Sequence, residues 1–76
     1  MSRVMTVLYR KEVAENLKTA RLKAGLTQTE VEEVAGVAYR HYQDIEAGKV
    51  DVRLDTLCRL AKAFKTMVAK LVRGRC

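Results

Sequence analysis

Residues 26–49 read LTQTEVEEVAGVAYRHYQDIEAGK, and this stretch decides the fold. It opens with a helix start, because Thr27 can cap a helix and Glu30, three residues later, completes a capping box. Gly36 ends this short helix, since glycine tolerates the left-handed backbone of a helix C-terminus. Another helix follows over about residues 38–47 and stops at Gly48. Two short helices joined by a tight glycine turn are the sequence form of a helix-turn-helix.

Both helices of this unit have an apolar side that must be buried. In the first helix the residues expected to face inward are Val31, Val34 and Ala35. In the second helix Tyr42 and Ile45 form the apolar stripe, and Val37 in the turn is expected to plug the core.

Three more helices are expected around this unit. From Lys11 to the stop at Gly25, one helix face carries Val13, Leu17, Ala20, Arg21 and Ala24 at spacings of three and four. A fourth helix has the stripe Leu54, Leu57, Leu60, Ala61 and Phe64. A fifth, short helix is indicated by Met67, Val68, Leu71 and Val72. The sequence therefore predicts an all-α fold of five helices.

The 76 residues fit a single domain. We divide the chain into an N-terminal arm (residues 1–10), a helix-turn-helix domain (residues 11–73) and a basic tail (residues 74–76). Residues 1–9 are apolar and β-branched, and their pattern fits a flexible arm, a short strand or an early start of the first helix. Cys58 lies among apolar neighbours and is expected to be buried, whereas Cys76 is expected to be an exposed thiol.

Composition narrows the class of function. The net charge of +6 favours a polyanionic partner, either nucleic acid or an anionic membrane surface. No apolar run approaches the ~20 residues of a membrane span, and the basic stretches lack the aromatic anchors of a membrane-surface helix. The two cysteines and one histidine do not have the spacing of a metal site, and no nucleophile–base pair or phosphate-binding glycine loop is present. We therefore expect a cytoplasmic protein that is not an enzyme and needs no metal or other cofactor.

Five linked blocks carry a family resemblance: LTQTEV (26–31), AGV (35–37), IEAGK (45–49), LDTL (54–57) and LAKAF (60–64). Together they resemble the phage repressor and Cro-like (XRE-type) DNA-binding family, which also includes restriction-modification controller proteins and some antitoxins. The resemblance covers about residues 12–72. It implies a five-helix repressor-like domain in which the third helix enters the major groove of double-stranded DNA.

The resemblance also implies roles for individual residues. The positions that match the base-reading residues of the family are Ala38, Tyr39, Arg40 and Asp44. The expected phosphate contacts are Thr27, Gln28, His41, Gln43, Lys49 and Arg53. Arg40 could present its fork to guanine or be a solvated surface arginine, and Asp44 could accept from a cytosine amino group or simply stay on the surface.

Two further features follow from the comparison with the family pattern. The family often joins the positions of Arg21 and Glu46 by a partly buried salt bridge, so we expect this pair here rather than two separate surface charges. Glu32 occupies a position that is usually small, so its side chain must swing outward or force the two helices apart.

Charge is distributed unevenly along the chain. Residues 26–48 hold five acidic residues against the single cation Arg40, a net charge of −4. Because phosphate neutralisation drives most of the affinity for DNA, binding would rely on Lys49, Arg53 and the helix N-termini, with the terminal arms as a further source of contacts.

These observations predict a sequence-specific regulator, a repressor, that binds a near-palindromic operator as a homodimer. The dimer surface is expected at Met67, Val68, Leu71 and Val72, or at the apolar stretch Val4–Leu8, and the alternative for either stretch is that it fills the core of the monomer. The alternative is a protein-interaction module, such as an antitoxin or co-regulator, that keeps the fold and binds a protein partner. The acidic charge of residues 26–48 favours that alternative.

Overall fold

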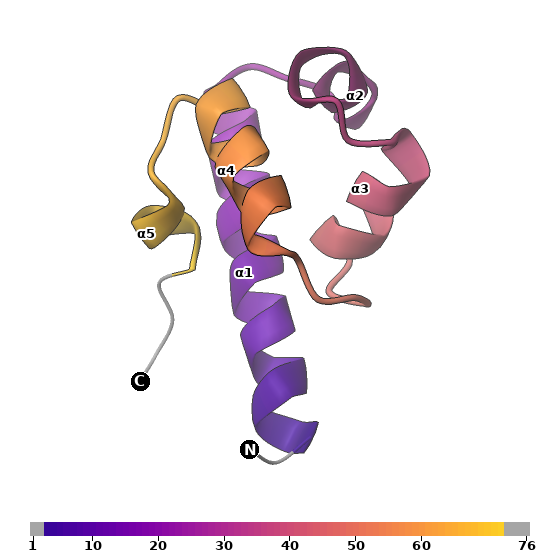
Figure 1. Cartoon of the computed structure of the whole chain (residues 1–76), viewed down its shortest axis with the longest axis vertical. Coiled ribbons are helices and arrows are strands. Elements are labelled where there is room, and N and C mark those ends of the chain that lie inside the picture. Colours follow the sequence, from indigo (N-terminus) through magenta and orange to yellow (C-terminus); the bar gives the residue numbers. More distant parts are fainter. Residues whose placement is uncertain (1–2, 73–76) are drawn as a thin grey trace.

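A computed structural model describes the backbone of residues 3–72 and the side chains of residues 10–72. Within this range the chain forms five helices and no strand, so the all-α prediction is confirmed. The helices are α1 (Arg3–Lys23), α2 (Gln28–Ala35), α3 (Tyr39–Glu46), α4 (Leu54–Ala63) and α5 (Val68–Leu71) (Figure 1).

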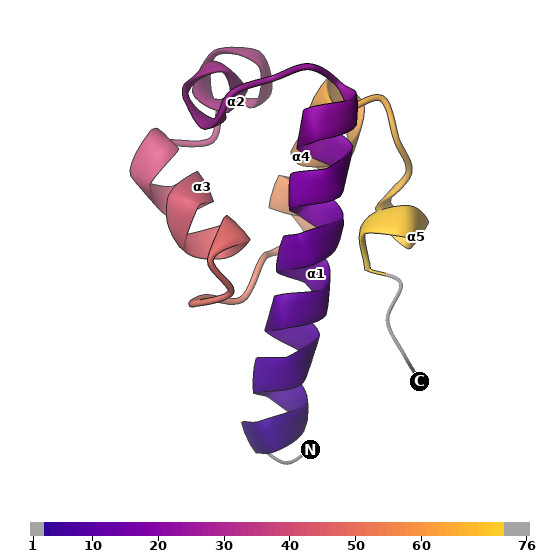
Figure 2. The ribbon, with the colours of Figure 1, turned by 180° about the vertical axis from the view of Figure 1, so that it is seen from behind.

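Helices α1 and α4 lie at the centre of the molecule. The α2–α3 pair lies on one side of them and α5 lies on the other, as both views show (Figures 1 and 2). The N-terminal turns of α1 project beyond the remaining helices (Figure 2). The helix-turn-helix unit and α5 therefore occupy separate faces of the domain.

A single apolar core joins all five helices. Tyr42 of α3 is fully buried, and its ring meets that of Phe64 edge to face with centroids 6.1 Å apart. The core consists of Val13, Leu17, Val31, Ala35, Val37, Tyr42, Ile45, Leu57, Leu60, Ala61, Phe64 and Leu71. Tyr42 and Ile45 in this core hold the inner face of α3, which packs against α1 and α2.

The ends of α2 match the prediction. The Thr27 hydroxyl accepts from the Glu30 backbone N–H at 3.2 Å, and the Glu30 carboxylate accepts from the Thr27 N–H at 2.8 Å. Gly36 ends α2 with a φ of 71°, the left-handed conformation that glycine adopts without strain. The capping box and the glycine turn are thus confirmed.

Residues 3–10 differ from our assignment to an N-terminal arm. They belong to α1, so that of the three alternatives for this stretch the early helix start is the one found. No glycine or proline interrupts residues 3–23, and a helix that has formed adds further residues readily. Residues 1–2, the basic tail 74–76 with Cys76, and the side chains of Val4–Leu8 lie outside the described part of the chain.

Three side chains predicted to be buried are exposed. Val34 is 54% exposed because α2 packs through Val31 and Ala35, and Val34 lies beside that face. Leu54 is 68% exposed because it is the first residue of α4, before the turn that packs on the core. Cys58 is exposed because successive helix residues are about 100° apart, so it points away from the buried side.

Helix α5 is mainly part of the core. Leu71 is 1% exposed, and Val68 and Val72 pack against the buried cluster, whereas Met67 is 62% exposed. The side-chain amide of Asn16 donates to the Leu71 carbonyl at 2.9 Å and ties α5 to α1. Of the four residues expected at a dimer surface, Met67 alone is widely open to solvent.

Candidate nucleic-acid interface

Helix α3 has one buried face and one open face. Tyr42 and Ile45 anchor the buried face. On the open face, the predicted base-reading residues Ala38, Tyr39 and Arg40 are exposed, and Asp44 is partly exposed. The predicted phosphate contacts Thr27, His41, Gln43, Lys49 and Arg53 are exposed as well. Helix α3 therefore presents a row of side chains to solvent, while its buried residues Tyr42 and Ile45 fix the orientation of the helix.

A buried ion pair fixes the C-terminal end of α3. The Arg21 guanidinium donates from Nε to Glu46 Oε2 at 2.9 Å and from Nη2 to Oε1 at 3.0 Å. The same guanidinium donates from Nη1 to the Leu26 carbonyl at 2.8 Å. The side chains of the pair are only 10% and 5% exposed. Arg21 thus joins α1, the loop before α2 and the end of α3.

Gln28 belongs to the same network. Its Nε2 donates to Glu46 Oε1 at 3.0 Å, which links the start of α2 to the end of α3. An amide nitrogen carries two hydrogens, so one remains to donate to a phosphate oxygen. The contact therefore holds Gln28 in place without using up its capacity for the predicted phosphate contact.

The pKa of Glu46 reflects its surroundings. Burial alone would raise it, but hydrogen bonds from Arg21 and Gln28, the nearby Tyr42 hydroxyl and the Arg21 charge outweigh burial and hold the pKa below its ordinary value. Glu46 is therefore ionised at neutral pH, and its charge is balanced inside the protein.

Tyr42 contributes a buried hydroxyl with no proper partner. Among the described residues no group meets hydrogen-bond geometry with its Oη. Burial raises the pKa of the phenol, and the nearby Glu46 carboxylate raises it further. The ring supplies packing, while the hydroxyl is a polar group that the core leaves unsatisfied.

Tyr39 and Gln43 form a pair on the open face of α3. Gln43 Nε2 donates to the Tyr39 hydroxyl oxygen at 2.9 Å, as the spacing of four residues allows. The hydroxyl proton of Tyr39 stays available to a phosphate or a base. The pair orients the tyrosine ring along the helix before any ligand arrives.

Both helices of the unit carry a carboxylate at the N-terminus. Glu30 closes the capping box of α2. Glu32 swings outward, the first of the two alternatives for this residue, and its Oε1 accepts from the Tyr39 backbone N–H at 3.0 Å. Sequence reasoning noted that Glu32 was unusual but missed that it caps α3. The sequence feature that could have indicated this cap is Ala38, because alanine at the N-cap position of α3 cannot cap the helix with its own side chain.

A shallow polar hollow of about 380 Å³ gathers several predicted contact residues from separate elements. It is lined by Lys18, Gln28, Gln43, Asp44, Glu46, Ala47 and Lys49. Since Arg21 balances Glu46, the two lysines outweigh Asp44 there. Sequence reasoning missed Lys18, although it lies three residues before Arg21, a spacing that places both on one side of α1.

Contacts with α1 hold the loop that carries Lys49. A Cβ on Gly48, whose φ is 74°, would lie 3.5 Å from Lys11 Cγ, so the chain passes close to α1 at this point. Two residues beyond Lys49, Asp51 receives hydrogen bonds from Arg10 Nε at 2.6 Å and Nη2 at 3.2 Å. Arg53 lies further along, with its side chain 86% exposed.

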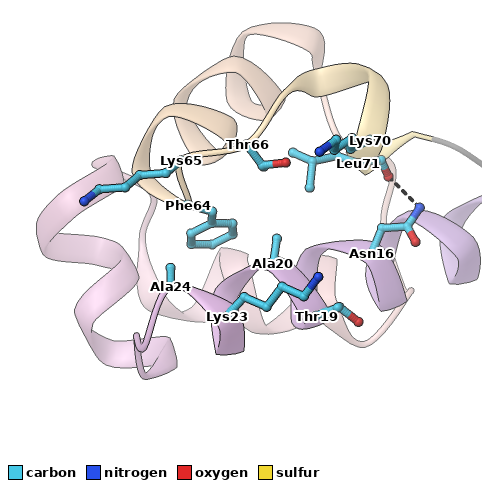
Figure 3. Close-up of a pocket in the computed structure, with 10 residues that line it drawn as sticks. All are labelled: Asn16, Thr19, Ala20, Lys23, Ala24, Phe64, Lys65, Thr66, Lys70 and Leu71. Atoms are coloured by element: carbon cyan, nitrogen blue, oxygen red, sulfur yellow. Dashed lines mark hydrogen bonds between the residues drawn. The ribbon is translucent and has the colours of Figure 1, made fainter.

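A second groove, of about 430 Å³, lies between α1, the end of α4 and α5 (Figure 3). Its apolar lining includes Ala20, Phe64 and Leu71, and Lys23, Lys65 and Lys70 are the charged residues among those that line it (Figure 3). Helix α5, which forms one wall of this groove, lies on the side of α1 and α4 opposite the α2–α3 unit (Figure 1).

The described residues contain neither a membrane-spanning helix nor a cluster of metal-ligating side chains. None of the helices there is long and apolar enough to cross a lipid bilayer. The same residues contain no group of three or more histidine, cysteine, aspartate or glutamate side chains that could hold a metal ion.

Comparison with known proteins agrees with the geometry. A helix-turn-helix family model matches residues 17–73, most of the chain. No curated protein and no solved structure gives a match. The matched range contains the buried Arg21–Glu46 pair, the capping box and the open face of α3. The chain therefore belongs to the XRE-type helix-turn-helix family, a family of DNA-binding regulators rather than of enzymes.

Proposed function

We propose that this protein is a sequence-specific transcriptional repressor that acts in the cytoplasm as a homodimer on a near-palindromic operator. The observation that carries the proposal is the division of α3 into a fixed side and an open side. Tyr42, Ile45 and Glu46 hold the helix, while Tyr39 and Arg40 remain exposed at its N-terminal end. Residues at this end of a recognition helix contact base edges in the major groove.

Arg40 is the residue on which sequence preference would depend most. A guanidinium can donate two parallel hydrogen bonds to guanine O6 and N7, the commonest specific contact in the major groove. Lys18, Lys49 and Gln28 would contact phosphates around the polar hollow and fix the register of α3 on the duplex. The net −4 charge of residues 26–48 implies that these few phosphate contacts are essential.

Dimerisation is part of the proposal because one domain offers few base contacts. Two copies related by a two-fold axis would place their recognition helices about 34 Å apart, one turn of DNA. Met67, exposed beside α5, and the projecting start of α1 are the surfaces that would meet.

The test is a selection of binding sites from random duplex DNA at near-physiological salt. We expect a palindrome whose half-site centres lie about one helical turn apart. Enrichment of one unpaired half-site would contradict the dimer, and no enrichment at all would contradict specific binding.

A second candidate function is supported by the lysine-lined groove. A groove with an apolar floor and lysines at its edge fits an amphipathic helix that carries carboxylates, as a protein partner of an antitoxin or co-regulator would. No residue of α3 lines the groove, and α5 lies on the side of α1 and α4 opposite α3, so such a partner could bind while the open face of α3 stays accessible (Figure 1).

A Leu- and Glu-rich helical peptide is a suitable probe of this candidate. We expect it to shift the NMR signals of Thr19 and Thr66, which line the groove, and the double variant Lys65→Glu/Lys70→Glu to abolish the shifts. Unchanged peptide binding by that variant, or no shift in the parent protein, would contradict a docking role.

A further inference from the structure

The N-terminus of α3 has no cap of its own. Ala38 occupies the capping position, and its methyl group cannot accept a hydrogen bond. The first backbone N–H groups of any helix lack partners within the helix and attract anions. In α3 the carboxylate of Glu32 accepts from the first of these, the Tyr39 N–H.

Glu32 holds both ends of the turn between α2 and α3. Its backbone carbonyl accepts from the Gly36 N–H at 3.1 Å, and its side chain accepts from the Tyr39 N–H at 3.0 Å. The carboxylate is exposed rather than packed between the helices. A negative charge therefore stands in the open at the start of the helix that is proposed to enter DNA.

The other acidic residues of the unit are placed differently. Glu30 is engaged in the capping box of α2, and Glu46 is balanced by Arg21. Within the described part of the chain, the side chains of Glu33 and Asp44 form no such hydrogen bond or ion pair. Glu32 alone among the five bonds to the N-terminus of α3.

We propose that Glu32 sets the affinity of this protein for DNA: its carboxylate occupies the anion-accepting end of α3 and repels the phosphates that approach it. The inference rests on the proposed function of α3 as the DNA-reading helix. It makes the domain a weak binder whose affinity depends strongly on the remaining phosphate contacts. A purely structural role for the Glu32 contact predicts no gain in affinity, because a change at this position would leave α3 held as before or more loosely.

The experiment compares Glu32→Gln with Glu33→Gln. Each variant removes one charge from the same turn of α2, and the new amide in Glu32→Gln keeps an oxygen that can accept from the Tyr39 N–H. Circular dichroism checks that both variants stay folded. Affinity is measured by fluorescence anisotropy with the selected operator and with a random-sequence duplex, at about 0.1 M and about 0.3 M salt, a range over which screening changes appreciably.

We expect Glu32→Gln to bind both duplexes about tenfold more tightly, and Glu33→Gln about twofold, as order-of-magnitude values for one charge near phosphates. At the higher salt the Glu33 effect should vanish and part of the Glu32 effect should persist, because screening acts least on a charge at close contact. Equal gains for both variants, or weaker binding by Glu32→Gln, would overturn the inference. If neither the parent protein nor any variant binds either duplex, the proposed function itself fails. That result is distinguishable from the outcomes that overturn the role of Glu32 alone.

Discussion

The guanidinium of Arg21 and the carboxylate of Glu46 form a two-pronged pair, with Nε to Oε2 at 2.9 Å and Nη2 to Oε1 at 3.0 Å, almost out of reach of solvent. The two residues are 25 positions apart in the chain, and their contact closes α1 onto the end of α3. The ion pair thus helps to fix the orientation of α3, together with the buried side chains of Tyr42 and Ile45.

Removing one partner of this pair should destabilise the fold strongly. Arg21→Ala leaves the Glu46 charge buried and unpaired, and we expect a loss of about 3–5 kcal/mol in the free energy of unfolding. The double variant Arg21→Ala/Glu46→Ala should lose less than the sum of the single changes, because it strands no charge. Urea denaturation of the four proteins measures the coupling.

The Arg10–Asp51 pair is the matched control for that cycle. It has the same forked geometry but is open to solvent, so its coupling should be far smaller. Equal coupling in the two cycles would show that burial does not strengthen the Arg21–Glu46 pair.

Stability should fall in acid because of Glu46. Its pKa in the folded protein lies below the ordinary value of 4.5, so the folded state favours the ionised form. The resulting stabilisation is fully present above pH 4.5 and is lost as the pH falls through the folded-state pKa. The difference in unfolding free energy between the parent protein and Glu46→Gln should therefore shrink below pH 4.5. A difference independent of pH would contradict this assignment.

Tyr42→Phe should preserve or slightly raise stability. The change keeps the edge-to-face contact with Phe64 and removes a buried hydroxyl without a hydrogen-bond partner, so we expect a change between zero and a gain of about 1 kcal/mol. The pKa of Tyr42 is raised in the folded protein, so the folded state favours the protonated phenol. The stability that depends on this protonated form is present below pH 10 and is lost as the pH rises further. Thermal unfolding from neutral pH to about pH 11 should show a shallower alkaline decline in the variant. A clear loss of stability at neutral pH would mean that the hydroxyl donates to Glu46.

Arg40 and Lys49 should affect DNA binding in different ways. Arg40→Ala would remove the proposed base contact and should relax the preference at one base pair by about 1–3 kcal/mol. Lys49→Ala would remove a proposed phosphate contact, so it should weaken binding to all sequences alike and lower the salt dependence by about one counterion. Titrations on the selected operator and on single-base variants separate the two effects. The same uniform loss for both variants would refute these roles.

Sequence reasoning succeeded where several signals point to the same structure. The Thr27–Glu30 capping box, the glycine at position 36 and the helical spacing from Val13 to Leu17 each fix one feature, and together they define the helices. The Arg21 and Glu46 side chains also lie as the family pattern suggested. The base and phosphate contacts, by contrast, remain predictions until DNA binding is measured.

The failures have physical causes. In a helix as short as α2, apolar residues three and four apart fit more than one inward face, so spacing alone did not exclude Val34. The neighbours of Cys58 in the sequence are apolar, but successive residues of a helix are about 100° apart, so the Cys58 side chain points away from the buried face of α4. The Glu32 cap and the position of Lys18 depend on how helices meet in space, which local pattern does not encode.

The inner and outer faces of α3 share no residue, and this separation has an evolutionary consequence. Tyr42, Ile45 and Glu46 are constrained by packing and by the buried network, whereas substitutions at Ala38, Tyr39 and Arg40 disturb neither. If α3 reads DNA as proposed, its sequence preference can therefore diverge after gene duplication at little cost to the fold. Two copies that differ at a few surface positions would control separate promoters in one cell on an unchanged scaffold.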